Sequence, residues 1–365
     1  MGFYLGVTLG STALALLAQF ARARRAARPA QGRFCETPEY VLMALSLAPY
    51  FLTMGLRYAI GTDYFAVYWP AFGMVAEGQP GPVNEIGYRV LVRLILLVTQ
   101  DSTWLFLTCA LLIVGSTGAA LWKFSDIPWI SILLFAADRT FFMGMNVMRQ
   151  YMALAVVIWA FPYIRSKCFW KYALVVMAAS TLHTSMLMFL PLYLLVYIPL
   201  TPLFGGAVIT VMFLLREPLA GVVHRIASMT RFIKYYDHMA DISPLYREKF
   251  LYLLVIAAVA SILYRRCRSK PGFQFLYNLE LLALFISFNR SVVIQADRIS
   301  WNLEFFHLLL IPALISACKK KWQKGVVGAV CIGVCLWFCW YEIFHCGYHE
   351  VVPYRCVFFS EVRFG

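Results

Sequence analysis

Long apolar runs separated by short polar or basic segments make up nearly all of the chain. A helix of about 20 predominantly apolar residues crosses the hydrocarbon core of a bilayer. Runs of this kind predict spans over 3–20, 39–56, 103–122, 127–144, 150–164, 203–219, 249–264, 273–289, 299–317 and 325–343. The stretch 170–199 is short for two crossings and is interrupted by Pro191 and Pro199, which predicts two short, broken helices that meet near His183. We therefore expect an all-α polytopic membrane protein, a single domain over 1–365 with about 12 transmembrane helices (11–13).

Composition agrees with this prediction, because 62% of the residues are apolar and 14% are charged, against roughly 25% charged in soluble domains. The net charge of +14 suggests nucleic acid at first. The basic residues, however, cluster between apolar runs, as the positive-inside rule requires of cytoplasmic loops. The clusters lie within 22–33, 165–171, 265–270 and 319–324. With these four loops in the cytoplasm, both termini and the loops at about 57–102 and 220–248 are expected outside, and nucleic acid is not expected as a partner.

The loop 57–102 is too apolar to be a simple solvated connection. Tyr64, Tyr68 and Phe72 recur at helical spacing, and Arg89 and Arg93 interrupt an apolar run. Aromatic rings and long basic side chains of this kind favour the membrane interface. We expect two amphipathic helices that lie on the outer surface of the membrane.

Ionisable residues at or inside a membrane face cost about 2.5–3.5 kcal/mol each at a helix centre, so each indicates a function or a pairing. The candidates are Arg57, Asp63, Glu85, Asp138, Arg139, Arg149, His183, Arg290, Asp297, Arg298, Glu304 and His307. On the expected topology nearly all of them lie toward the outer side. Guanidinium groups there suit a pyrophosphate, because their rigid fork binds phosphate oxygens and keeps its charge. The chain has no Walker loop, dinucleotide glycine fingerprint or Asp-x-Asp pair, which favours a lipid-linked sugar donor.

Several short motifs resemble those of one family. They are GLRYAIGTDYFAVY at 55–68, NEIGY at 84–88, NVMRQYMA at 146–153, TLHTS at 181–185, the segment Arg298–Pro312 and the pair Pro353-Tyr354. In this order the chain is similar to the EpsG family of Wzy-like polysaccharide polymerases. The resemblance implies a fold of the C-type glycosyltransferase kind and an enzyme in the cytoplasmic membrane. Such an enzyme joins polyprenyl diphosphate-linked oligosaccharide repeat units on the outer face, in exopolysaccharide, capsule or O-antigen synthesis. Expected partners are this substrate, membrane lipid, and flippase and chain-length regulator proteins.

Joining repeat units requires a base for the attacking hydroxyl and positive charge for the departing diphosphate. His183 is the expected base, because an imidazole accepts a proton at neutral pH, and Asp63 and Glu85 are its rivals. Arg57, Arg149 and Arg298 are expected to bind the diphosphate, with Arg290 in reserve and Tyr64, Tyr68 and Gln150 beside the substrate. No metal and no cofactor is expected.

Each assignment has a structural alternative. Asp63 and Glu85 can cap the helices that follow them, Arg57 and Arg149 can anchor helices at the interface, and His183 can satisfy a backbone carbonyl. Glu304 and His307 suggest a buried pair or a proton relay, and Cys346 and Cys356 a disulfide in the outer tail; Asp237, His238 and Asp241 are weak candidate metal ligands.

The whole chain also has alternative functions. A lipid-linked oligosaccharide flippase or other transporter should show internal repeats and deeply placed charges. A membrane acyltransferase that modifies polysaccharide should line a cytoplasmic path with the basic cluster after residue 164.

Overall fold

The computed structural model describes residues 1–26, 38–215, 245–289 and 296–359, together with isolated positions between 218 and 228. Over these residues every regular element is a helix, and one isolated bridge pairs the backbones of Arg57 and Cys356. The chain forms two compact units. The first comprises Met1–Tyr193 and Cys339–Gly365, and the second comprises Leu194–Phe338. The all-α prediction is confirmed for the described part of the chain.

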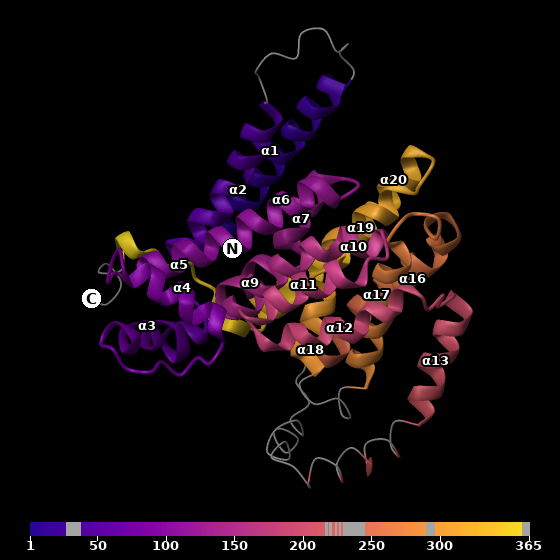
Figure 1. Ribbon diagram of the computed structural model, residues 1–365. Coiled ribbons are helices and arrows are strands. Elements are labelled where there is room, and N and C mark those ends of the chain that lie inside the picture. Colours follow the sequence, from indigo (N-terminus) through magenta and orange to yellow (C-terminus); the bar gives the residue numbers. More distant parts are fainter. Residues whose placement is uncertain are drawn as a thin grey trace. The chain divides into compact units, whose positions relative to one another are not determined.

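The first unit opens with two long helices that pack along each other, α1 (Gly2–Ala26) and α2 (Pro38–Gly55) (Figure 1). Its third long helix is a continuous run, Thr103–Phe124, made of α5 (Thr103–Ala110), a π-helical stretch and α6 (Thr117–Phe124). Shorter helices complete it: α3 (Trp69–Ala76), α4 (Ile86–Leu96), α7 (Pro128–Ala137), α8 (Thr140–Asn146), α9 (Met148–Val157), α10 (Phe161–Arg165), α11 (Phe169–Ser180) and α12 (Phe189–Leu192).

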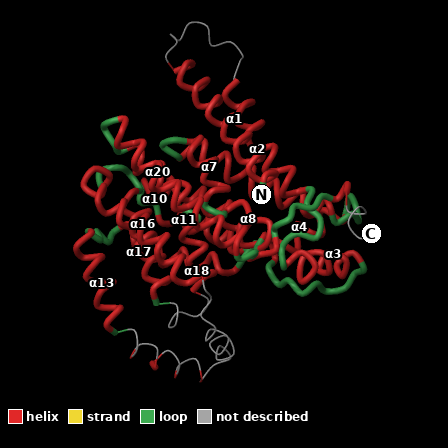
Figure 2. The backbone as a smooth tube through the Cα atoms, turned by 180° about the vertical axis from the view of Figure 1, so that it is seen from behind, coloured by secondary structure: helices red, strands yellow, loops and turns green. Residues whose placement is uncertain are grey.

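Polar residues interrupt the apolar helices of this unit at two expected spans. The predicted span 127–144 is two helices, because Arg139 adopts a left-handed conformation (φ 63°) between α7 and α8. The predicted break near His183 is confirmed: α11 ends at Ser180, His183 is extended (φ −154°, ψ 117°), and a second set of short helical turns begins at Thr184. The tube in Figure 2 shows the resulting pattern of short helices joined by loops.

The second unit contains α13 (Pro202–Leu214), α16 (Leu245–Cys267), α17 (Phe273–Phe288), α18 (Ala296–Glu304), α19 (His307–Ser316) and α20 (Lys321–Cys339), and the chain returns to the first unit at Cys339. Helices α16 and α17 pack against each other. Helices α18 and α19 are separated by a short break and bent by 44°, so the predicted span 299–317 is a broken one.

Four helices of the described residues are long and apolar enough to cross a bilayer, or five if the bent pair counts as one span. The four are Gly2–Ala26, Thr103–Phe124, Arg247–Cys267 and Lys321–His345. A helix of 10 residues such as α7 covers about 15 Å, half the hydrocarbon thickness. Apolar helices on this scale fit a membrane protein, whereas the count of about 12 crossings and the placement of both termini outside stay predictions.

The loop 57–102 contains the two helical segments expected from its sequence, at Tyr64–Ala76 and Ile86–Leu96. In α4, Tyr88, Val92 and Ile95 are buried while Ile86, Val90 and Leu94 are exposed. Most of the second expected outer loop, 220–248, lies outside the described residues, as do Asp237, His238, Asp241 and Arg290.

Candidate functional site

Three of the expected site residues meet in the first unit. The Arg149 guanidinium donates from Nη1 to Oε2 of Glu85 at 2.7 Å, and Nδ1 of His183 lies 3.8 Å from the other oxygen, Oε1. Their side chains are 22%, 14% and 21% exposed, so the group is partly sheltered but open to a ligand. Residues almost 100 positions apart thus form one cluster, which we call the Glu85 cluster.

Glycine 87 is the reason that Glu85 reaches the break beside His183. The backbone N–H of Gly87 donates to the Thr181 carbonyl at 2.8 Å. A Cβ atom at position 87 would lie 2.5 Å from Thr181 Oγ1 and 2.9 Å from its carbonyl oxygen. The first turn of α4 can therefore approach the end of α11 only because residue 87 has no side chain.

The capping alternatives for the two acidic residues find no support. Glu85 stands at the N-cap position of α4 and Asp63 at that of the short helix Tyr64–Tyr68, and neither makes a side-chain capping hydrogen bond. The Glu85 carboxylate bonds Arg149 instead. The structure thus favours a role for Glu85 in the cluster.

Two tyrosines enclose Arg149. The hydroxyl of Tyr68 accepts a hydrogen bond from the Arg149 backbone N–H at 3.4 Å, and the Tyr88 ring centroid lies 5.8 Å from the guanidinium carbon. Burial raises the pKa of Tyr68 to about 12, so its hydroxyl stays protonated at neutral pH. Tyr64 is also buried and stacks on Phe106 with ring centroids 4.4 Å apart. Contact of Tyr64 and Tyr68 with a sugar stays a prediction.

Arg57 is fully buried, just before the loop that carries Asp63. Its guanidinium donates to the Met54 carbonyl, lies 3.4 Å from the sulfur of Met148 and sits 4.7 Å from the Phe106 ring centroid. Burial lowers the pKa of Arg57. Among the described residues no carboxylate pairs with it, and its Nε atom has no hydrogen-bond partner. A buried cation held this way is costly, which distinguishes Arg57 from the paired Arg149.

The Gly-Thr-Asp loop is held by Asn146 at the end of α8. The Asn146 Oδ1 atom accepts hydrogen bonds from Thr62 Oγ1 and from the Asp63 backbone N–H, each at 3.0 Å. Its Nδ2 atom lies 2.7 Å from Nδ1 of His349. The segment after α20 therefore returns to the loop that carries Asp63.

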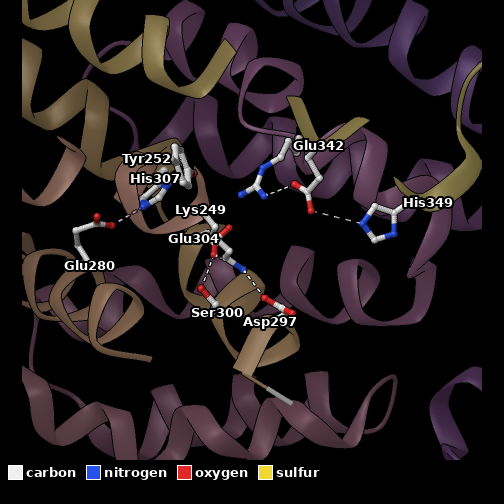
Figure 3. Close-up of polar contacts among 10 residues, drawn as sticks. Lys249, Tyr252, Glu280, Asp297, Ser300, Glu304, His307, Glu342 and His349 are labelled. Atoms are coloured by element: carbon white, nitrogen blue, oxygen red, sulfur yellow. Dashed lines mark hydrogen bonds and ion pairs between the residues drawn. The ribbon is translucent and has the colours of Figure 1, made fainter. Parts of the chain in front are cut away.

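Sequence reasoning missed two members of this network, Glu342 and His349 (labelled in Figure 3). The Glu342 carboxylate forms a buried ion pair with Arg139, and its other oxygen lies 3.8 Å from His349 Nε2. Arg139 was a candidate, but its partner was not. The available signal was an acid near the end of an apolar span, which is costly unless it is paired.

The second unit holds its own buried polar groups, also drawn in Figure 3. His307 bonds Tyr252 through Nδ1 at 2.8 Å and Glu280 through Nε2 at 2.5 Å. Glu304 accepts from Ser300 and pairs with Lys249 at 3.0 Å, while Lys249 lies 3.5 Å from Asp297. Glu304 and His307 are thus both buried, but their ion-pair partners are Lys249 and Glu280, whereas the sequence suggested a pair between these two residues.

The other expected ligands are placed as follows. Gln150 is buried in α9 directly after Arg149, and Arg298 is exposed on α18 in the second unit. Cys346 and Cys356 do not form the suggested disulfide. Cys331, Cys335 and Cys339 are buried, as expected for small apolar residues on one helix face.

The Glu85 cluster combines a proton acceptor with fixed opposite charges. Nδ1 of His183 accepts a hydrogen bond from the Ser185 backbone N–H at 3.4 Å. Once protonated, it would instead donate toward the Glu85 carboxylate, which stabilises imidazolium. The Arg149 guanidinium offers further donors to an anion. Such a cluster can take a proton from a hydroxyl and hold a phosphate group nearby.

Comparison with known proteins identifies the family. The model of the EpsG family matches residues 40–356, a range that contains the Glu85 cluster, Arg57 and the loop with Asp63. Searches of curated proteins and of solved structures give no match. The chain belongs to the EpsG family and is accordingly a membrane protein of the Wzy-like polymerase, or glycosyltransferase, type.

Proposed function

We propose that this protein polymerises polysaccharide by joining polyprenyl diphosphate-linked oligosaccharide repeat units on the outer face of the cytoplasmic membrane. The observation that carries the proposal is the Glu85 cluster, in which an imidazole and a guanidinium share one carboxylate at 3.8 and 2.7 Å. This arrangement supplies both requirements of the reaction, a base and an anion ligand, in a partly exposed place.

In the proposed reaction an acceptor hydroxyl attacks the anomeric carbon of the lipid-linked sugar. A new glycosidic bond forms, the bond from carbon to the diphosphate oxygen breaks, and the hydroxyl proton passes to His183. Glu85 stabilises the resulting imidazolium, and Arg149 stabilises the charge on the polyprenyl diphosphate that leaves. A single displacement inverts the anomeric configuration. All charge stabilisation comes from side chains, so the reaction is proposed to need no metal.

Further residues of the first unit have proposed roles. Asp63 is the rival base, because its backbone N–H bonds Asn146, three residues before Arg149. Arg57 is proposed as a further diphosphate ligand, and Tyr68 as the residue that holds the backbone of Arg149 in place. Arg298 lies in the second unit, and its role as a diphosphate ligand stays a prediction.

Gene deletion tests the proposal, followed by complementation and sizing of the surface polysaccharide. We expect deletion to leave single repeat units and the wild-type gene to restore long chains. His183→Ala and Arg149→Ala should fail to restore them, whereas the matched exposed controls His345→Ala and Arg265→Ala should succeed. Full-length polymer from both site variants would remove the residue assignment, and unchanged polymer after deletion would remove the polymerase function.

A further inference from the structure

A cavity of about 280 Å³ lies beside α3 and α4 in the first unit. The polar residues that line it are Gln79, Asn84, Tyr88, Arg89 and Arg93. The loop Gly78–Gly81 also lines it. Glu85, in the same segment, bonds Arg149 and is not among the residues that line the cavity.

The two arginines of this cavity are available to bind an anion. Arg89 and Arg93 are four positions apart and therefore lie one turn apart on the same side of α4. Within the described ranges, neither guanidinium makes an ion pair or a hydrogen bond. Two like charges at this spacing repel each other, and an anion between them would remove the repulsion.

An unusually exposed apolar surface runs along the same helix. Ile86, Val90, Leu94 and Leu97 are 66%, 47%, 56% and 82% exposed, and their spacing puts them on one face. By helical geometry the two arginines lie at the edge of this face, between it and the buried face of Tyr88 and Val92. One helix thus offers a basic cavity and, directly beside it, a surface for hydrocarbon chains.

We propose that this cavity binds the phosphate headgroup of an anionic membrane phospholipid, whose acyl chains lie along the exposed face of α4. Charge selects the lipid, because a zwitterionic headgroup would bring a cation to two unpaired guanidinium groups. The apolar face selects a lipid over a soluble phosphate, because burying its side chains adds binding free energy that inorganic phosphate cannot gain. The inference does not rest on the polymerase function.

The test uses the full-length protein in nanodiscs of zwitterionic lipid that contain a small fraction of phosphatidylglycerol. Native mass spectrometry measures the anionic lipid retained by the protein. Each arginine near an anionic surface is expected to contribute about a fivefold change in affinity, so Arg89→Gln with Arg93→Gln should lower retention about 25-fold. Leu94→Gln should also lower it. The control, Arg265→Gln with Arg268→Gln, removes the same charge from exposed positions and should leave retention unchanged.

Several results would overturn the proposal. Equal losses from the two arginine pairs would indicate diffuse attraction to the surface instead of a site. Competition by inorganic phosphate at the same concentration as the lipid would show that the apolar face contributes nothing. The cavity would be assigned to a glycan if an acidic oligosaccharide displaced the bound lipid and the arginine variants left lipid retention unchanged. The five substituted side chains are four arginines and Leu94, all at exposed positions, so a melting curve suffices to exclude misfolding.

Discussion

The close contact between Gly87 and Thr181 can be tested by adding one methyl group at position 87, which should move Glu85 away from His183. In Gly87→Ala the new Cβ would meet Thr181 Oγ1 at 2.5 Å, about 0.9 Å closer than the 3.4 Å at which ordinary contacts begin. The Thr181 carbonyl, at 2.9 Å, is backbone and cannot rotate away. The first turn of α4 must therefore withdraw and lengthen the 2.8 Å hydrogen bond from Gly87 to Thr181.

The expected cost is large for activity and moderate for stability. Glu85 and His183 each lie two residues from this contact, so a withdrawal of about 1 Å acts directly on their 3.8 Å separation. Misplacement by about 1 Å can cost about 100-fold in rate. Overpacking of this kind destabilises a fold by about 1–3 kcal/mol. Gly87→Ala should therefore lower polymer formation about 100-fold and lower the melting temperature modestly.

Gly73→Ala is the matched control. A Cβ atom at Gly73, within α3, has no neighbour inside 4 Å. Alanine is favoured over glycine inside helices by about 0.5–1 kcal/mol, so this variant should be slightly more stable and fully active. Adding Thr181→Ala to Gly87→Ala removes only the hydroxyl contact and should rescue activity in part. Wild-type polymer length and rate from Gly87→Ala would refute the claim that this approach positions the cluster.

Three further predictions follow from the same unit. Glu85→Gln removes the charge that stabilises the His183 imidazolium at 3.8 Å, an interaction of about 1–4 kcal/mol, so the acid limb of the pH–rate profile should move down by about 1–3 pH units; an unmoved limb would contradict the pairing. Arg57→Met should keep the unfolding free energy within about 1 kcal/mol, because the buried cation lacks a carboxylate partner, and yet reduce polymer formation; a large fall in melting temperature with normal polymer would make Arg57 structural. Replacing Cys346 and Cys356 by serine should leave the melting temperature unchanged with and without reductant, since no disulfide joins them; a loss of stability only under oxidising conditions would reveal a bond.

Periodicity and hydropathy predicted the helices well but not their continuity. The break near His183 could be anticipated, because the stretch 170–199 has an awkward length and contains two prolines. The break between α7 and α8 could not, because it falls at Arg139, whose ion-pair partner Glu342 is about 200 residues away. A window of local sequence registers apolar content, whereas a helix ends where a distant partner makes another backbone conformation favourable.

For the candidate site, too, the sequence indicates single residues but not their distant partners. Glu85, Arg149 and His183 were selected one at a time, from the cost of charge in a membrane and from motifs, and the structure brings all three together. The roles of Glu342 and His349 could not be derived, since nothing local to either residue indicates Arg139 or Asn146 as its partner. Individual ionisable residues can thus be recognised from a sequence, while their pairing requires the fold.

The ion pair between Glu85 and Arg149 affects how the proposed diphosphate substrate would bind. Arg149 is already neutralised by Glu85, so a diphosphate can take this guanidinium only by competing with the carboxylate. Once displaced, Glu85 retains its charge beside His183 and is no longer balanced by Arg149. The imidazolium then becomes more favourable when the leaving group is bound, which strengthens the base at the stage when the hydroxyl proton must be removed. A carboxylate shared by an imidazole and a guanidinium can therefore couple donor binding to proton transfer, which two independent residues could not do.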